Sequence, residues 1–196
     1  MKKSLGPRIS ANPTPVWVIG SYDAQGRPNV MTAAWAGVCS SKPPCVAVSL
    51  RPATYSHGSI LARRAFSVSI PSRRNMLEAD YMGMASGREA DKFAAAGLTP
   101  ARCEHVDAPY VAEFPLILEC KVLHVHDLGM HTQFVGEVMN VLADESALNA
   151  EGKPDMDLIQ PFVYSPDTRS YHMVGPLAAK DFSVGMPLVE RKEGKA

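Results

Sequence analysis

The fold is decided by residues 16–50, which read VWVIGSYDAQGRPNVMTAAWAGVCSSKPPCVAVSL. The run 16–22 is rich in β-branched and aromatic residues, and the Asp23-Ala24-Gln25-Gly26 turn separates it from a second extended run at 28–32. These two runs are predicted to form a β-hairpin. Pro43-Pro44 interrupts the segment that follows, so that residues 45–50 are predicted to form a third short strand.

Further strands are expected at 65–70, 116–126, 132–143 and 171–174. In the second of these, one face carries Leu116, Leu118, Cys120 and Val122, and the other carries Glu119 and Lys121. This alternation predicts an antiparallel sheet with one covered face and one partly wetted face.

Helical signals are fewer and shorter. Ser56 is a candidate N-cap for a helix that runs through Arg64, and Ser72 is a candidate N-cap for the next helix. That second helix is expected from the helical spacing of Leu77, Tyr81 and Met84. A short helix near 89–96, ended by Gly97, and one helical turn near 155–160 complete the prediction.

The predicted fold is mostly β, a β-barrel with a few helices. The chain has 14 Gly and 16 Pro among many short strands, a composition that favours a barrel over a helical bundle. A chain of 196 residues is expected to form one domain, residues 1–196, with its core at about 13–175 and a C-terminal tail at 176–196.

The charge balance narrows the classes of partner. Twenty basic and twenty acidic side chains give a net charge of zero, so nucleic acid and anionic membranes are not expected partners. No apolar run approaches the length of a membrane span, and we expect a cytoplasmic protein. The four cysteines contain no C-x-x-C pair, and reduced thiols are expected.

An ordered set of motifs identifies a family resemblance. The chain resembles the flavin-reductase-like domain family, and within it the flavoredoxins, over roughly residues 13–175. The resemblance implies an FMN-binding split barrel with antiparallel Greek-key topology that forms a homodimer. It rests on PTPV with Gly20 at 13–20, NVMTAAWA at 29–36, PP at 43–44, SLRPATYS at 49–56, SG with DKF at 86–93, and GMHT with GEV at 129–138.

Small residues in the second motif suit a flavin ring. Thr32, Ala33 and Ala34 let backbone groups approach the polar edge of the isoalloxazine, although tight packing at a strand end explains the same residues. Trp35 either packs beside the ring or anchors the core. Asn29, Met31 and Cys39 are expected to complete this part of the site.

A second group of residues suits a phosphate. A stretch of eight residues, 49–56, contains Arg51 and three hydroxyl side chains, those of Ser49, Thr54 and Ser56. This stretch is a predicted strand-to-helix turn and also includes Leu50. A guanidinium, hydroxyls and the amides of a helix N-terminus are the donors that a phosphate binds. Lys92 is a second candidate cation. The alternative is that Arg51 faces water and Lys92 pairs with Asp91 or Glu89.

His131 is the single candidate for a catalytic role. It lies in Gly129-Met130-His131-Thr132, where relatives that use NAD(P)H have Gly-Asp-His, with the histidine by the nicotinamide. Met130 replaces the aspartate here, which favours a redox protein over NAD(P)H as the electron donor. The alternative for His131 is a turn histidine bonded to backbone. No metal is expected, because His124 and His126 lack a third patterned ligand.

These features predict an FMN-dependent oxidoreductase that transfers electrons through its bound flavin. One alternative is an NAD(P)H:flavin oxidoreductase that supplies reduced FMN to a partner. A second alternative is a split barrel that binds flavin or haem without catalysis.

Overall fold

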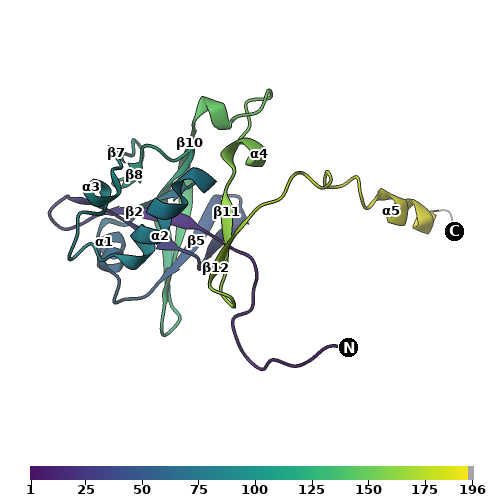
Figure 1. Cartoon of the computed structure of the whole chain (residues 1–196), viewed down its shortest axis with the longest axis horizontal. Helices are drawn as coiled ribbons and strands as arrows, with labels where there is room; N and C mark the ends of the chain where they lie inside the picture. Colours follow the sequence, from purple (N-terminus) through teal and green to yellow (C-terminus); the bar gives the residue numbers. More distant parts are fainter. Residues whose placement is uncertain (194–196) are drawn as a thin grey trace.

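The computed structural model describes residues 1–193, with the side chains of 1–189. Its main feature is a seven-stranded antiparallel sheet in the order β3-β2-β6-β9-β10-β5-β4. Strands β2, β5 and β10 of this sheet are labelled in Figure 1. The strands are β2 (Trp17–Tyr22), β3 (Pro28–Ala33), β4 (Ala36–Ser41), β5 (Pro44–Leu50), β6 (Ala65–Ile70), β9 (Leu116–Asp127) and β10 (Thr132–Ala143). All the long strands predicted from the sequence are present, and β4 is an addition that pairs with β5 across Lys42-Pro43.

The sheet curls into a split barrel. Its two edge strands, β3 and β4, are separated in the chain by Ala34 and Trp35 alone, so its edges must approach each other. The concave side encloses a core that includes Phe66, Phe134 and Ile60, the last from helix α1 (Tyr55–Arg63). The predicted mostly β, split-barrel class is therefore confirmed.

A second core lies between the sheet and two helices. It joins Val18, Val30 and Ile117 of the sheet to Met82 of α2 (Met76–Met84) and Phe93 of α3 (Lys92–Ala96).

The remaining elements are β1 (Thr14–Pro15), η1 (Arg73–Asn75), β7 (Pro100–Arg102), β8 (Pro109–Val111), η2 (Glu145–Ala147), α4 (Met156–Ile159), β11 (Phe162–Ser165), β12 (Ser170–Met173) and α5 (Met186–Glu193). The C-terminal segment leads away from the sheet to α5 (Figure 1). No helix within residues 1–193 is long and apolar enough to cross a membrane.

Three local features differ from the sequence pattern, although the helix expected around Leu77, Tyr81 and Met84 is present as α2. Thr54, not Ser56, occupies the N-cap position of α1, because the helix begins two residues earlier than expected, and Ser56 is buried in its first turn. Helix α2 packs through Ala79 and Met82, whereas Leu77 and Met84 are each 79% exposed. Both pairs of residues have helical spacing, so spacing alone does not show which pair packs against the sheet. The small side chain of Ala79 lets the helix approach β3 closely, and Thr32 Oγ1 donates to the Ala79 carbonyl.

Glu119 is the third correction, because it is fully buried on the face expected to be partly wet. Its carboxylate accepts the His105 backbone N–H at 2.7 Å and lies 3.2 Å from His105 Nδ1. Asn140 Nδ2 of β10 donates to it at 3.4 Å. These donors replace water around the carboxylate.

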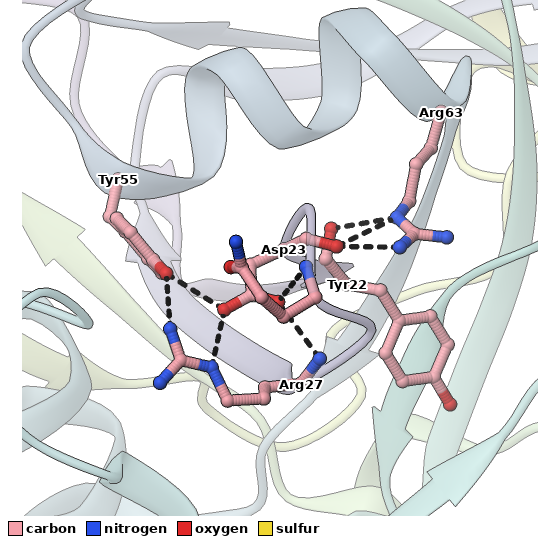
Figure 2. Close-up of polar contacts among 6 residues, drawn as sticks. Tyr22, Asp23, Arg27, Tyr55 and Arg63 are labelled. Carbon is pink, nitrogen blue, oxygen red and sulfur yellow. Dashed lines mark hydrogen bonds and ion pairs between the residues drawn. The ribbon is translucent and has the colours of Figure 1, made fainter.

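Asp23 fastens the β2–β3 turn to helix α1 (Figure 2). Its Oδ1 accepts the backbone N–H groups of Gln25 and Arg27, each at 2.9 Å. Its Oδ2 accepts Tyr55 Oη and Arg27 Nε, each at 2.8 Å. Arg63, near the other end of α1, donates to the carbonyls of Tyr22 and Asp23. Burial alone would raise the pKa of Asp23, but these donors outweigh it and hold the pKa at about 2.

We expect Asp23→Asn to lower the free energy of unfolding by about 1 to 3 kcal/mol at pH 7, because hydrogen bonds to a charged acceptor are weakened. The native carboxylate contributes fully above the unfolded pKa of about 4, and its contribution is lost as pH falls toward 2. Urea titrations at pH 7 and pH 3 should therefore show the two proteins converging at low pH.

Asp107→Asn is the matched control for this prediction. Asp107 pairs with Arg63 at the same end of the molecule, but its side chain is 47% exposed, so the loss should be small. Equal losses for the two variants would show that Asp23 has no special role in stability.

Candidate cofactor site

A cavity of about 210 Å³ lies where the N-terminus of α1, the end of α2 and the start of α3 meet. We call it the helix-end cavity. Five residues expected from the sequence to bind the cofactor line it: Asn29, Met31, Thr54, Ser56 and Lys92. They come from β3, α1 and α3, so the fold brings together three segments that are far apart in the chain.

Lys92 places a buried positive charge at this cavity. The residue is 5% exposed, and its Nζ donates to the Met82 carbonyl at 2.8 Å. Burial lowers the pKa of the ammonium to about 8. Within residues 1–189 no ion pair includes Lys92, and the carboxylate of Asp91 instead accepts the Ala94 backbone N–H at 3.1 Å as the N-cap of α3. A buried ammonium with donors to spare suits an anionic ligand.

The first turn of α1 adds donors at the same cavity. Thr54 occupies the N-cap position, but its hydroxyl donates to the Arg51 carbonyl at 2.9 Å and makes no cap bond. The Thr54 side chain therefore leaves the backbone amides at the start of the helix uncapped. Amides in this position, together with the helix dipole, favour a phosphate or a carboxylate.

Asn29 provides an acceptor without a donor. Its Nδ2 donates to Ser56 Oγ at 2.8 Å, and both side chains are buried. Its Oδ1 is buried and has no hydrogen-bond partner within the described part of the chain. A Cβ on Gly87 would lie 2.2 Å from this oxygen and 2.6 Å from Tyr55 Cδ1, so the loop at Gly87 packs directly against Asn29. An unpaired acceptor beside an ammonium and hydroxyl donors fits a phosphorylated polyol.

A second cavity of about 490 Å³ lies on the other side of Gly83, which lines both cavities. Thr32 and Ala34 line it, together with Met84, Asp80, Val16, Tyr164, Arg169 and Tyr171. Tyr171 Oη donates to Asp80 Oδ1 at 2.7 Å. Ala33 points into the barrel core instead, as the alternation along β3 requires. The small residues expected beside the flavin ring are therefore split between this cavity and the core.

The other predicted site residues lie outside both cavities. Leu50 is buried in the barrel core, Ser49 donates its N–H to the Trp35 carbonyl at 2.8 Å, and Trp35 is half-buried. The Arg51 side chain is exposed, and Cys39 is exposed on β4. His131 is half-buried beside the β9–β10 loop, where its carbonyl accepts the Leu128 N–H at 2.8 Å. The roles proposed for these residues in flavin binding stay predictions.

Tyr55 and Arg88 were missed as site residues. Both line the helix-end cavity, where Arg88 Nη1 donates to the Ala53 carbonyl at 3.0 Å. The guanidinium carbon lies 5.6 Å from the centroid of the Tyr55 ring. Tyr55 stands inside the motif SLRPATYS, and Arg88 lies between the SG and DKF parts of the motif at 86–93, so their positions were a usable signal.

A sequence profile of the flavin reductase like domain matches residues 9–171. The structure of the flavoredoxin of Desulfovibrio vulgaris (Miyazaki F) superposes with a TM-score of 0.90 at 54% identity, covering 94% of this chain and 100% of that chain.

Two further relatives are more distant. The FMN-binding protein from Thermus thermophilus with bound 1-cyclohex-2-enone superposes with a TM-score of 0.77 at 26% identity, covering 92% and 98% of the two chains. The high molecular weight rubredoxin of Moorella thermoacetica is 30% identical over 152 residues, which are 74% of this chain and 58% of that protein.

Proposed function

The chain belongs to the flavin reductase like domain family, and we propose that it binds FMN and works as an oxidoreductase that transfers electrons through the bound flavin. The observation that carries the proposal is the buried ammonium of Lys92, which faces a cavity and lacks an acidic partner in the described chain. The similar FMN-binding protein and flavoredoxin support the choice of FMN.

The chain's own residues would hold the cofactor by its two ends. Lys92, Ser56 and the first-turn amides of α1 would bind the phosphate, and Asn29 Oδ1 would accept from a ribityl hydroxyl. The flavin ring would lie along residues 32–35, toward the second cavity. When bound, a flavin accepts a hydride or single electrons. The protein binds, orients and shields it, and this task needs no catalytic acid or base, so a direct role for His131 stays a prediction.

Lys92→Met should weaken FMN binding by about tenfold to 100-fold and riboflavin binding far less, because a charge-assisted hydrogen bond is lost only where a phosphate is present. In the native protein, FMN affinity should fall as pH rises above 8, by up to about tenfold per pH unit and by no more in total than the loss in Lys92→Met, because binding then requires Lys92 to take up a proton. Riboflavin affinity should stay flat. Quenching of flavin fluorescence measures both ligands.

Two controls make this test decisive. The pKa of Lys92 is lower in the folded protein than in the unfolded chain, so its charge opposes folding at pH 7. The Lys92→Met variant should therefore unfold at a urea concentration no lower than that of the native protein. Arg51→Ala removes the exposed cation that the sequence suggested. If Arg51→Ala loses more FMN affinity relative to riboflavin affinity than Lys92→Met does, the phosphate does not bind in the helix-end cavity. If Lys92→Met loses equal affinity for FMN and riboflavin, Lys92 does not bind the phosphate.

We further propose a protein as the electron donor. Met130 is 72% exposed and Leu128 is 59% exposed in the β9–β10 loop, so this loop presents apolar side chains to a partner. NADH and NADPH should then reduce the FMN-loaded protein slowly in stopped-flow measurements, while dithionite reduces it readily. Met130→Asp should be reduced faster by the dinucleotides. Fast reduction of the native protein by either one would favour direct use of NAD(P)H.

A homodimer in the cytoplasm is the remaining proposal. Leu77 and Met84 on α2 are both exposed, and Met84 also lines the second cavity, so a second copy of the chain would cover an apolar surface at the flavin site. Light scattering of the FMN-loaded protein should give twice the chain mass of 21.2 kDa. Leu77→Asp should reduce this mass, and a monomeric native protein would exclude the dimer.

A further inference from the structure

The helix-end cavity has an outer neighbour. A hollow of about 320 Å³ lies on the surface between the β2–β3 turn and the loop that precedes α3. The hollow and the cavity share four lining residues: Asn29, Tyr55, Gly87 and Arg88. These four residues form the wall between the cavity and the surface, and we call them the outer wall.

Three members of the outer wall are held in place. Tyr55 Oη donates to Asp23 Oδ2 at 2.8 Å (Figure 2). Asn29 Nδ2 donates to Ser56 Oγ at 2.8 Å. Gly87 packs so closely against both that a Cβ there would overlap them. This part of the wall cannot move without disturbing the turn and the start of α1.

Arg88 is the movable member. Its side chain is exposed, and it is attached by the hydrogen bond to the Ala53 carbonyl and by its contact with the Tyr55 ring. It lines the helix-end cavity, the outer hollow and a third hollow of about 430 Å³ beside α1. Arg88 and Tyr55 are the two outer-wall residues that line all three hollows, and the Arg88 guanidinium lies over the Tyr55 ring.

We propose that Arg88, with Tyr55 beneath it, makes the site selective for a flavin mononucleotide over flavin adenine dinucleotide. This inference rests on the proposed function. A mononucleotide ends at its phosphate and fits inside the wall. A dinucleotide continues with a second phosphate and an adenosine, which must pass through the wall and displace Arg88 from both of its contacts. The guanidinium thus acts as a specificity-determining group.

The test is the ratio of the dissociation constants for FAD and FMN, measured by quenching of flavin fluorescence with the full chain. The native protein should bind FMN more tightly by tenfold or more. Arg88→Ala should lower the ratio by about tenfold, because a hydrogen bond and a cation–π contact no longer oppose FAD. Arg88→Lys should lower it less, because its aliphatic stem still covers the opening.

Arg74→Ala serves as the charge control, because it removes one positive charge from a residue that lines none of these hollows, and its ratio should equal the native one. Equal affinities of the native protein for FMN and FAD would overturn the inference. So would an unchanged ratio in Arg88→Ala, even with FMN binding intact. If neither flavin binds the native protein, the proposed function fails and the inference fails with it.

Discussion

Ala34 and Trp35 form the whole connection between β3 and β4, the two edge strands of the seven-stranded sheet. Two linking residues span roughly 10 Å, so the sheet edges must meet and the sheet must curl. The curl directs Ala33 into the barrel core, while Thr32 and Ala34 line the cavity beneath α2. The position of the second cavity therefore follows from the closure of the sheet, and the small residues in this segment serve the fold and the site together.

Lys92 shows a different relation between stability and function. The nearest acidic residue in sequence, Asp91, caps helix α3 through the Ala94 N–H, which leaves the neighbouring ammonium buried without a counter-charge in the described chain. A core selected for stability alone would replace such a group with an apolar side chain of similar volume. Lys92 lines the same cavity as Asn29, whose Oδ1 is buried without a hydrogen-bond partner in the described chain. A ligand could form hydrogen bonds with both groups.

Sequence patterns identified the long strands because alternation and turn residues are local properties. The failures came from contacts between distant segments. The local pattern predicts that Glu119 faces solvent, but in the fold the His105 N–H and Asn140 Nδ2, from distant segments, donate hydrogen bonds to its carboxylate. The sequence favoured Arg51 slightly over Lys92 as the phosphate ligand, but tertiary packing buries Lys92 and exposes Arg51. Arg88 lies between the two parts of the motif at 86–93, but its contact with Tyr55 joins residues 33 positions apart.

Tyr55 links the stability of the turn to the geometry of the site. It is the first residue of α1, its hydroxyl bonds Asp23, and its ring supports Arg88. Tyr55 therefore connects the β2–β3 turn and the start of α1 to the Arg88 side chain. Because the pKa of Asp23 is about 2 and that of Lys92 about 8, the turn keeps its charge throughout the range in which Lys92 loses its own. A change in ligand affinity between pH 7 and 9 consequently reports on Lys92 rather than on the scaffold around it.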